Sequence, residues 1–216
     1  PAPMAREWAE QHSSSEIVDV SAVGGGITNT KWRLRLNDGE QLALRWADPE
    51  RWGEVGREHV RREASACRLL ADSVAQVPRL VAANLTGESA GGPACLMEWR
   101  AGATRLDPLS PAAVSDLARA AVAIHAHRLP AGEQPPRFTY RGPSQLEVPA
   151  WSRRPELWRR AIEIRLAGEP ATSHGLIHRD FHFGILLWQG DESAAGEDWA
   201  ETSWGPSDLD VAHMCS

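Results

Sequence analysis

The sequence has only one lysine, Lys31, and its other strongly basic side chains are arginines. Any role that strictly needs a lysine therefore falls to Lys31 or is taken by an arginine. Cysteine is also scarce: Cys67, Cys95 and Cys215 lie far apart and form no C-x-x-C pair. This spacing argues against a disulfide framework and favours a reducing compartment.

Long apolar runs are missing as well. No segment approaches the roughly 18 apolar residues that cross a membrane, and residues 1–8 lack the apolar centre of a secretory signal. The net charge is −6, whereas a general nucleic-acid binder is usually basic. The sequence therefore predicts a soluble cytoplasmic protein that binds neither a membrane nor a nucleic acid, and it indicates no oligomeric state.

What the sequence does contain is the composition of a globular protein. Of its 216 residues, 42% are hydrophobic and 24% are charged, which predicts a packed core in one large domain or two small ones. A short helix is expected at 4–12. Alternating apolar residues then predict a β-meander with strands at 16–21, 31–36 and 41–46, the last two joined by a tight turn at Asn37-Asp38-Gly39.

After the meander the pattern changes from mostly extended to mostly helical, with a seam near 100–106. Helices are recognised here by apolar residues at helical spacing and by Ser–Pro at a helix start. The expected elements are a helix at 55–71, strands at 79–83 and 94–99, a helix that Ser110-Pro111 begins, a Pro-rich loop at 130–150, a helix at 154–167 and a strand at 185–188.

The most specific segment is His178-Arg179-Asp180-Phe181-His182. Two later segments follow it in order, Asp198-Trp199 and then Trp204-Gly205-Pro206 with Asp210. Together they resemble the aminoglycoside phosphotransferase family, whose usual strings read H-G-D-x-H-x-G-N and I-D-W, and the resemblance covers nearly the whole chain. A plainer interpretation is that His178 and Asp180 only hydrogen-bond a loop at a strand end.

The resemblance implies a fold and a reaction. The fold is α+β and bilobal, like that of protein kinases, with a β-rich, nucleotide-binding N-lobe at 1–99 and a mainly helical C-lobe at 100–216. ATP and Mg²⁺ are expected in the cleft between the lobes. The γ-phosphate is expected to move to a hydroxyl of a small molecule, either aminoglycoside-like or another amino alcohol or sugar.

The resemblance also assigns roles to three side chains. Phosphoryl transfer needs positioning and charge neutralisation more than covalent help. Asp180 is expected to orient the acceptor hydroxyl and accept its proton, and His178 to brace the loop that carries Asp180. Asp198 is expected to hold Mg²⁺, which prefers hard oxygen ligands.

Other histidines are open to simpler interpretations. His174, His178 and His182 recur every fourth residue, and on a helix that spacing would favour a zinc site. The surrounding glycine and phenylalanine pattern predicts strand and loop instead, which disfavours zinc. His125 and His127 are interpreted as part of a helix end, where histidine is favoured.

A glycine-rich turn after the first strand resembles the family's nucleotide loop. Glycine allows a backbone to approach phosphates closely, and the match would place Gly25, Gly26, Thr28 and Asn29 over the nucleotide. The turn is not a Walker A motif, because no Gly-Lys-Ser/Thr follows at the needed spacing. Taken alone, it could equally be a plain hairpin.

Two further segments complete the expected nucleotide site. Arg45, on the third strand, is expected to contact the phosphates. Glu63 lies beside the apolar stripe of the following helix, where a carboxylate needs a charge partner, and Arg45 can supply it; the alternative is a solvated Glu63. Met97, Glu98 and Trp99 resemble the hinge strand that holds adenine.

The chain departs from the family pattern near the expected metal site. Ile185 stands where the family has a metal-binding Asn, and an isoleucine has no side-chain oxygen; Phe183 replaces the usual Pro. These changes favour an alternative function, a catalytically impaired, nucleotide-binding pseudokinase or regulator. A protein kinase is disfavoured, because the chain has no recognisable D-F-G and little room for an activation segment.

Overall fold

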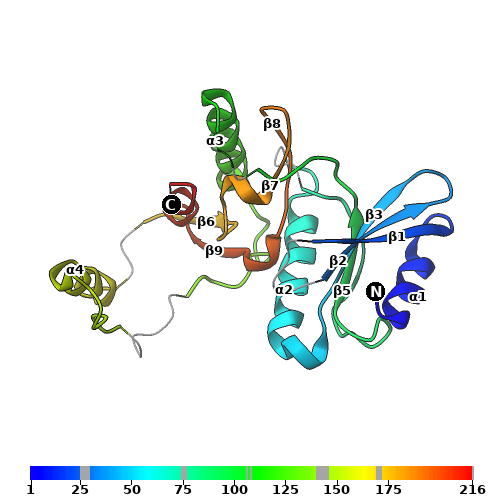
Figure 1. Cartoon of the computed structure of the whole chain (residues 1–216), viewed down its shortest axis with the longest axis horizontal. Helices are drawn as coiled ribbons and strands as arrows, with labels where there is room; N and C mark the ends of the chain where they lie inside the picture. Colours follow the sequence, from blue (N-terminus) through cyan, green and yellow to red (C-terminus); the bar gives the residue numbers. More distant parts are fainter. Residues whose placement is uncertain are drawn as a thin grey trace.

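The computed structural model describes residues 1–24, 30–73, 77–105, 107, 109–139, 146–168 and 172–215, with only the backbone of 193–195. Figure 1 shows an antiparallel sheet with helices on one side of the molecule, and helices with two small two-stranded sheets on the other. This is the mixed α+β, bilobal arrangement that the sequence predicted.

The larger sheet contains the predicted β-meander. Its strand order is β1-β2-β3-β5-β4, and every neighbouring pair is antiparallel. Gly39 has a φ of 89° in the turn between the second and third strands, a conformation that favours glycine. The strands are β1 (Ile17–Val23), β2 (Thr30–Leu36), β3 (Gln41–Trp46), β4 (Leu80–Asn84) and β5 (Ala94–Glu98).

One helix packs on each face of this sheet (Figure 1). Strand β3 explains why: its side chains alternate, so that Leu42 and Leu44 face one side and Ala43 and Arg45 the other. The leucine face contacts α1 (Pro3–His12) through a buried cluster that includes Trp8. The opposite face packs against α2 (Pro49–Leu69).

Helix α2 begins earlier than the predicted start at residue 55, but the helix expected from residue 55 onward is present. Asp48 caps the helix by accepting a hydrogen bond from the N–H of Glu50 at 2.9 Å, and Pro49 occupies the first turn. Gly53, at φ 45° and ψ −128°, then interrupts the helix with a kink. The Asp-Pro pair is a helix start that the sequence offers and that the apolar pattern alone does not reveal.

The second half opens with α3, whose predicted cap is present: Ser110 accepts a hydrogen bond from the N–H of Ala113 at 3.2 Å. No local pattern marks residues 203–206 as a strand, yet they pair with 174–177. The elements are α3 (Pro111–Ala126), α4 (Pro155–Leu166), β6 (His174–Ile177), β7 (Leu186–Gln189), β8 (Glu192–Gly196), β9 (Ser203–Pro206) and α5 (Asp208–Met214), with 3₁₀ turns at Phe183–Ile185 and Trp199–Glu201.

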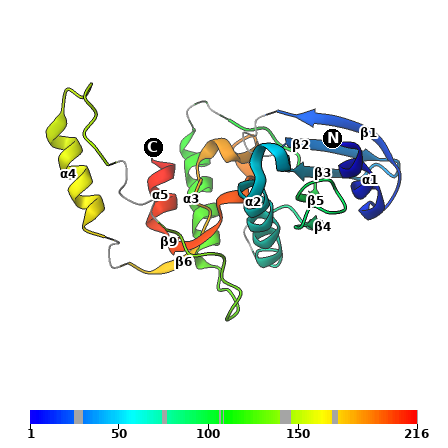
Figure 2. The same cartoon turned by 90° about the horizontal axis from the view of Figure 1, so that it is seen from below.

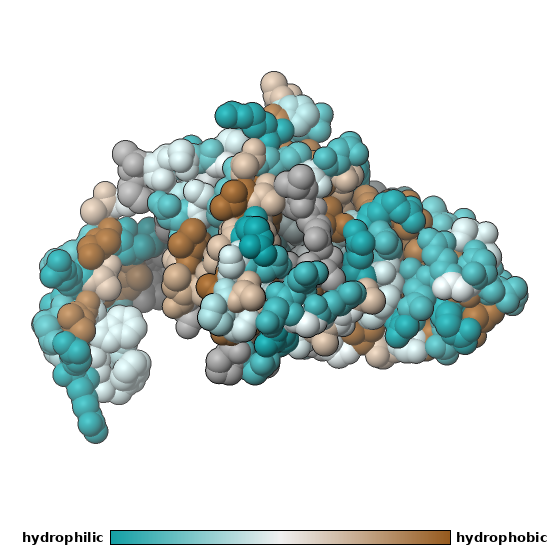
Figure 3. Space-filling view, turned by 90° about the horizontal axis from the view of Figure 1, so that it is seen from above, coloured by the Kyte–Doolittle hydropathy of each residue, from teal (hydrophilic) through white to brown (hydrophobic). Residues whose placement is uncertain are grey.

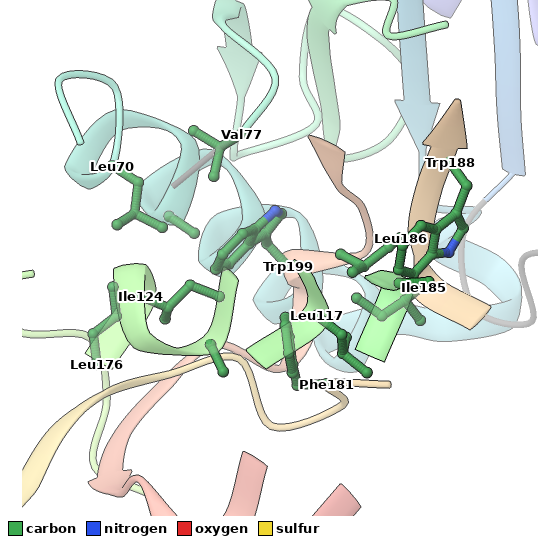
Figure 4. Close-up of a cluster of buried hydrophobic side chains, with 13 residues drawn as sticks. Leu70, Val77, Leu117, Ile124, Leu176, Phe181, Ile185, Leu186, Trp188 and Trp199 are labelled. Atoms are coloured by element: carbon green, nitrogen blue, oxygen red, sulfur yellow. The ribbon is translucent and has the colours of Figure 1, made fainter. Parts of the chain in front are cut away.

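A buried apolar cluster joins the two halves (Figure 4). Leu70 and Val77, which follow α2, pack with Ile124 of α3 and with Trp199. Side chains on both sides of the expected seam therefore share one core. Ile185 belongs to the same cluster.

Helix α4 stands apart from the rest of the molecule (Figures 1 and 2). None of its twelve residues is buried, and apolar side chains such as Leu157 and Ile164 reach the surface. Figure 3 shows both apolar and polar surface on this projecting part, at the left of the view. Among the residues that the structure describes, no helix has the length and apolarity needed to cross a membrane.

Candidate active site

A pocket that opens to solvent lies between the sheet and the second half of the chain. The pocket is lined by the sheet with the residues that follow β5, by helix α2, by the segment before β4 and by the loop after β8. Six of the predicted nucleotide and metal residues are among those that line it. The lining residues are Lys31, Ala43, Arg45, Glu63, Pro78, Met97, Glu98, Trp99, Arg100, Glu197 and Asp198.

Arg45 is the centre of an ion-pair network in this pocket. It lies on the α2 face of β3, and its Nη1 donates to Glu63 Oε2 at 2.7 Å and to Asp198 Oδ1 at 3.0 Å. Burial by itself would lower the pKa of Arg45, but the Glu63 and Asp198 carboxylates outweigh it and raise the pKa above its ordinary value. The guanidinium is therefore charged, and the predicted pairing with Glu63 is present.

Glu63 should contribute to stability through this pairing. Burial raises the pKa of Glu63, while Arg45 opposes the shift. Replacing Glu63 by Gln leaves a buried guanidinium with one carboxylate in place of two, and we expect the free energy of unfolding to fall by about 2–3 kcal/mol. Urea unfolding measures the change.

Glu58→Gln, on the same helix, is the matched control. Glu58 pairs with Arg61 and Arg62 near the surface, where such pairs contribute less than about 1 kcal/mol. A Glu63→Gln variant no less stable than Glu58→Gln would contradict the importance of the buried pair.

Asp198 lies at the opposite wall of the pocket, in the loop that follows β8. Its backbone is left-handed, at φ 59° and ψ 56°, which aspartate tolerates better than most residues. The side chain is 40% exposed. Burial alone would raise the pKa of Asp198, but Arg45 outweighs it and lowers the pKa, so the carboxylate is ionised at neutral pH.

These properties fit a magnesium ligand. Mg²⁺ is commonly held by one or two carboxylates, with phosphates and water completing its shell. Within the described residues, no group of three or more His, Cys, Asp or Glu side chains could hold a metal ion. Ile185 offers no side-chain oxygen; its side chain is buried in the apolar cluster, and its carbonyl accepts the N–H of Glu197 at 3.0 Å.

His178 is buried behind the loop that carries Asp180. Its Nε2 donates to the carbonyl of Glu197 at 2.9 Å, and its ring lies 4.5 Å from the ring of Trp199. Burial lowers the pKa of His178, although Asp210, Asp198 and Asp180 each oppose the shift. A neutral His178 therefore links the loop of residues 178–182 to the segment before Asp198.

Asp210 holds the same loop from the other side, a contact that the sequence patterns did not predict. It is fully buried. Its Oδ2 accepts from the N–H of His178 at 2.9 Å and from Nε2 of His125 at 2.9 Å, and its Oδ1 accepts from the N–H of Arg179 at 2.7 Å. His125 therefore does more than end a helix, because it also holds Asp210 in place. Helices α3 and α5, which carry these two residues, lie side by side (Figures 1 and 2).

The loop turns sharply before Asp180. Arg179 has a φ of 79°, a left-handed conformation that is costly for a residue with a side chain. The family strings have glycine at this position, which relieves that cost. In this chain Arg179 packs its guanidinium 4.2 Å from the centre of the Phe138 ring, and Asp210 fixes its N–H.

Asp180 itself is 43% exposed and is flanked by two histidines. Its Oδ1 lies 3.6 Å from Nδ1 of His213 and 3.9 Å from Nε2 of His182. It does not line the pocket that holds Arg45 and Asp198. The carboxylates of Asp180 and Asp198 both oppose the lowering of the His178 pKa.

The remaining predictions concern the hinge and the glycine turn. Met97 is buried on β5 opposite Ala43, Trp99 donates its N–H to the carbonyl of Gln41 at 3.0 Å, and both line the pocket with Glu98. Gly25, Gly26, Thr28 and Asn29 lie outside the described residues, so their expected position over a nucleotide stays a prediction.

The fold and the pocket define a class of protein. A β-sheet lobe and a helical lobe, with a buried arginine–glutamate pair next to an aspartate in the cleft, form the kinase-like arrangement of small-molecule phosphotransferases. A family model described as the phosphotransferase enzyme family matches residues 19–216. The chain belongs to this family.

Solved structures agree with the fold. A Ralstonia eutropha protein assigned as an aminoglycoside phosphotransferase aligns with a TM-score of 0.73 at 17% identity, over 100% of this chain and 69% of that one. Aminoglycoside phosphotransferase APH(4)-Ia aligns at 0.69 and 18%, over 98% and 76%. Spectinomycin phosphotransferase APH(9)-Ia, solved with ADP and spectinomycin, aligns at 0.66 and 16%, over 95% and 70%. No curated protein matches the chain.

Proposed function

We propose that this protein uses ATP to phosphorylate a hydroxyl of a small molecule. The observation that carries the proposal is the meeting of Arg45, Glu63 and Asp198, which come from a strand, a helix and a late loop, at one solvent-open pocket. Similar structures have been solved with ADP or with AMP-PNP, which supports a nucleotide as the ligand. The hinge residues Met97, Glu98 and Trp99 would then hold the adenine.

Each residue has a defined task in this proposal. Asp180 would receive the proton of the acceptor hydroxyl, within a loop that His178 and Asp210 hold in place. Arg45, kept in position by Glu63, would contact the phosphates, and Asp198 would hold Mg²⁺. Mg²⁺, when bound, neutralises charge that develops on the transferred phosphoryl group.

The acceptor class is part of the same proposal. The similar structures include complexes with spectinomycin and with hygromycin B, and a macrolide 2'-phosphotransferase from Brachybacterium faecium. An aminoglycoside, another amino alcohol or a sugar fits this range. We also propose a lobe boundary near residue 100 and a cytoplasmic location, where ATP is available.

Two measurements test the proposal. Isothermal titration calorimetry with ATP and Mg²⁺ should detect one site on the wild-type chain. A coupled assay of ADP release, with a panel of aminoglycosides, choline and homoserine, should find an acceptor that raises the rate above background ATP hydrolysis. A wild-type chain that binds no nucleotide would overturn the proposal.

A pseudokinase or regulator is the second candidate, and Ile185 favours it. This side chain is buried and apolar where the family has an oxygen ligand for the metal. Binding of ATP without ADP release for any acceptor would select this candidate over the enzyme.

Replacing Ile185 by Asn should raise the ADP-release rate about tenfold and lower the Mg²⁺ concentration needed for it, because metal-site contacts change affinity or activity by about 10–100-fold. The same change should cost about 1–3 kcal/mol of stability, because Asn cannot fill the place that Ile185 takes in the apolar cluster. Ile185→Val, which adds no oxygen, is the control and should change neither the rate nor the Mg²⁺ requirement. A rate that stays at the wild-type value in a folded Ile185→Asn variant would show that Ile185 is not the limiting feature.

A further inference from the structure

The only lysine of the chain lies in the pocket and has no role in the function proposed so far. Lys31 is the second residue of β2 and pairs directly with Arg45 of β3 in the antiparallel register. Side chains at such a position are about 5 Å apart at Cβ and share one face of the sheet. Any group that reaches Arg45 from the pocket therefore also comes within reach of Lys31.

Lys31 is held by a carboxylate from the opposite wall. Its Nζ forms an ion pair with Glu197, although the two residues are far apart in the sequence. Both side chains are largely withdrawn from solvent, at 12% and 22% exposure. Nζ also lies 5.4 Å from the centre of the Trp99 ring. The ion pair thus spans the pocket from the sheet to the residue before Asp198.

In this part of the pocket the carboxylates outnumber the cationic side chains, which disfavours binding of a negatively charged triphosphate. Arg45 is shared by Glu63 and Asp198, and Lys31 is taken by Glu197. These three carboxylates exceed the two cations by one negative charge. A nucleotide triphosphate entering here needs positive partners, and Arg45 is buried and held by two acids, whereas Lys31 has a flexible four-carbon stem and one acid partner.

We propose that Lys31 and Glu197 form a latch across the nucleotide pocket, and that Lys31 transfers from Glu197 to the nucleotide's phosphates when ATP binds. The inference rests on the proposed function, since it needs ATP as the ligand. An ammonium group binds phosphate as a point charge, so the transfer exchanges one ion pair for another of higher charge.

Calorimetric titration with ATP and with adenosine tests the latch, because adenosine has no phosphates. Lys31→Met should weaken ATP binding about tenfold, the loss expected for one charged contact, and should leave adenosine affinity unchanged or higher. Lys31→Arg should stay close to wild type. Glu197→Gln removes the competing carboxylate and should tighten ATP several-fold without tightening adenosine equally.

Arg33→Met is the matched control. Arg33 lies on the same strand and its guanidinium is 5.1 Å from the same Trp99 ring, but it is exposed, bonds Gln41 and does not line the pocket. It should change neither affinity.

The outcomes separate the two proposals. A wild-type chain that binds neither ATP nor adenosine would sink the proposed function together with the latch. If the wild type binds ATP, equal losses of ATP and adenosine in Lys31→Met, an unchanged ATP affinity in that variant, or weaker ATP binding in Glu197→Gln would each overturn the latch alone.

Discussion

Replacing Asp180 by Asn should lower the turnover number about 10³-fold, the range for loss of a positioned general base. The amide has nearly the same shape as the carboxylate but cannot accept the proton of an acceptor hydroxyl. Asp180 does not line the pocket of Arg45 and Asp198, so the Kd for ATP should not change. Single-turnover ADP release measures the rate, and calorimetry measures the Kd for ATP. The Asp180→Asn change is made in whichever background turns over faster, wild type or Ile185→Asn.

Asp208→Asn provides the comparison for this prediction. Asp208 is an exposed aspartate of α5, close in sequence to Asp210, and accepts from Thr172 Oγ1 at 3.4 Å. Its replacement should leave the turnover number intact. If Asp180→Asn keeps a substantial rate, Asp180 is not the proton acceptor, and its role is only to hold the shape of the loop.

Replacing Asp210 by Ala should cost about 3–5 kcal/mol of unfolding free energy, the largest stability effect expected in the chain. The carboxylate is fully buried and accepts three hydrogen bonds. Its removal leaves the N–H groups of His178 and Arg179 and the ring of His125 without their acceptor, and buried unpaired donors are costly. His125→Ala, which removes one of the three bonds, should cost about 1 kcal/mol.

The loss should also depend on pH. Burial alone would raise the pKa of Asp210, but hydrogen bonds from His125, His178 and Arg179 outweigh it, and the folded-state pKa lies below the ordinary value. A lowered carboxyl pKa stabilises the fold above the unfolded-state pKa of about 4, and that stability disappears as the pH falls through the folded-state pKa. The stability gap between wild type and Asp210→Ala should therefore be full at pH 7 and shrink below about pH 4.

Urea unfolding at pH 7 and at lower pH measures this gap. Asp208→Ala, on the same helix, should cost less than about 1 kcal/mol. A gap for Asp210→Ala that is small at pH 7, or that does not narrow in acid, would show that the three hydrogen bonds do not hold the loop.

Much of the sheet could be predicted because its signals are local. Alternating apolar residues in 31–36 and 41–46, with a glycine turn between them, determine both strands and the face each residue takes. The position of Glu63 beside the apolar stripe of α2 likewise indicated a buried partner, and Arg45 is that partner. The early start of α2 at Asp48-Pro49 also has a local signal, although it is a capping signal and not an apolar pattern.

Other features have no local signal. Residues 203–206 form a strand because β6 supplies backbone partners, not because their side chains favour it. Asp210 is an acidic residue in a short helix, and its sequence neighbours do not reveal that three donors surround it. Lys31 and Glu197 meet only because β2 and the end of β8 face the same pocket.

The sequence by itself determined the strands of the meander, the capped helix at Ser110, and the order of motifs that indicated a phosphotransferase, because these depend on neighbours within a few residues or on matching residue types. Only the tertiary structure decided which acids pair with which cations. A side chain's charge partner and its burial depend on elements that converge from distant parts of the chain, and the energy of a buried ion pair depends on both. That is why the Arg45–Asp198 contact, the Asp210 brace and the Lys31–Glu197 pair became visible only in the folded molecule.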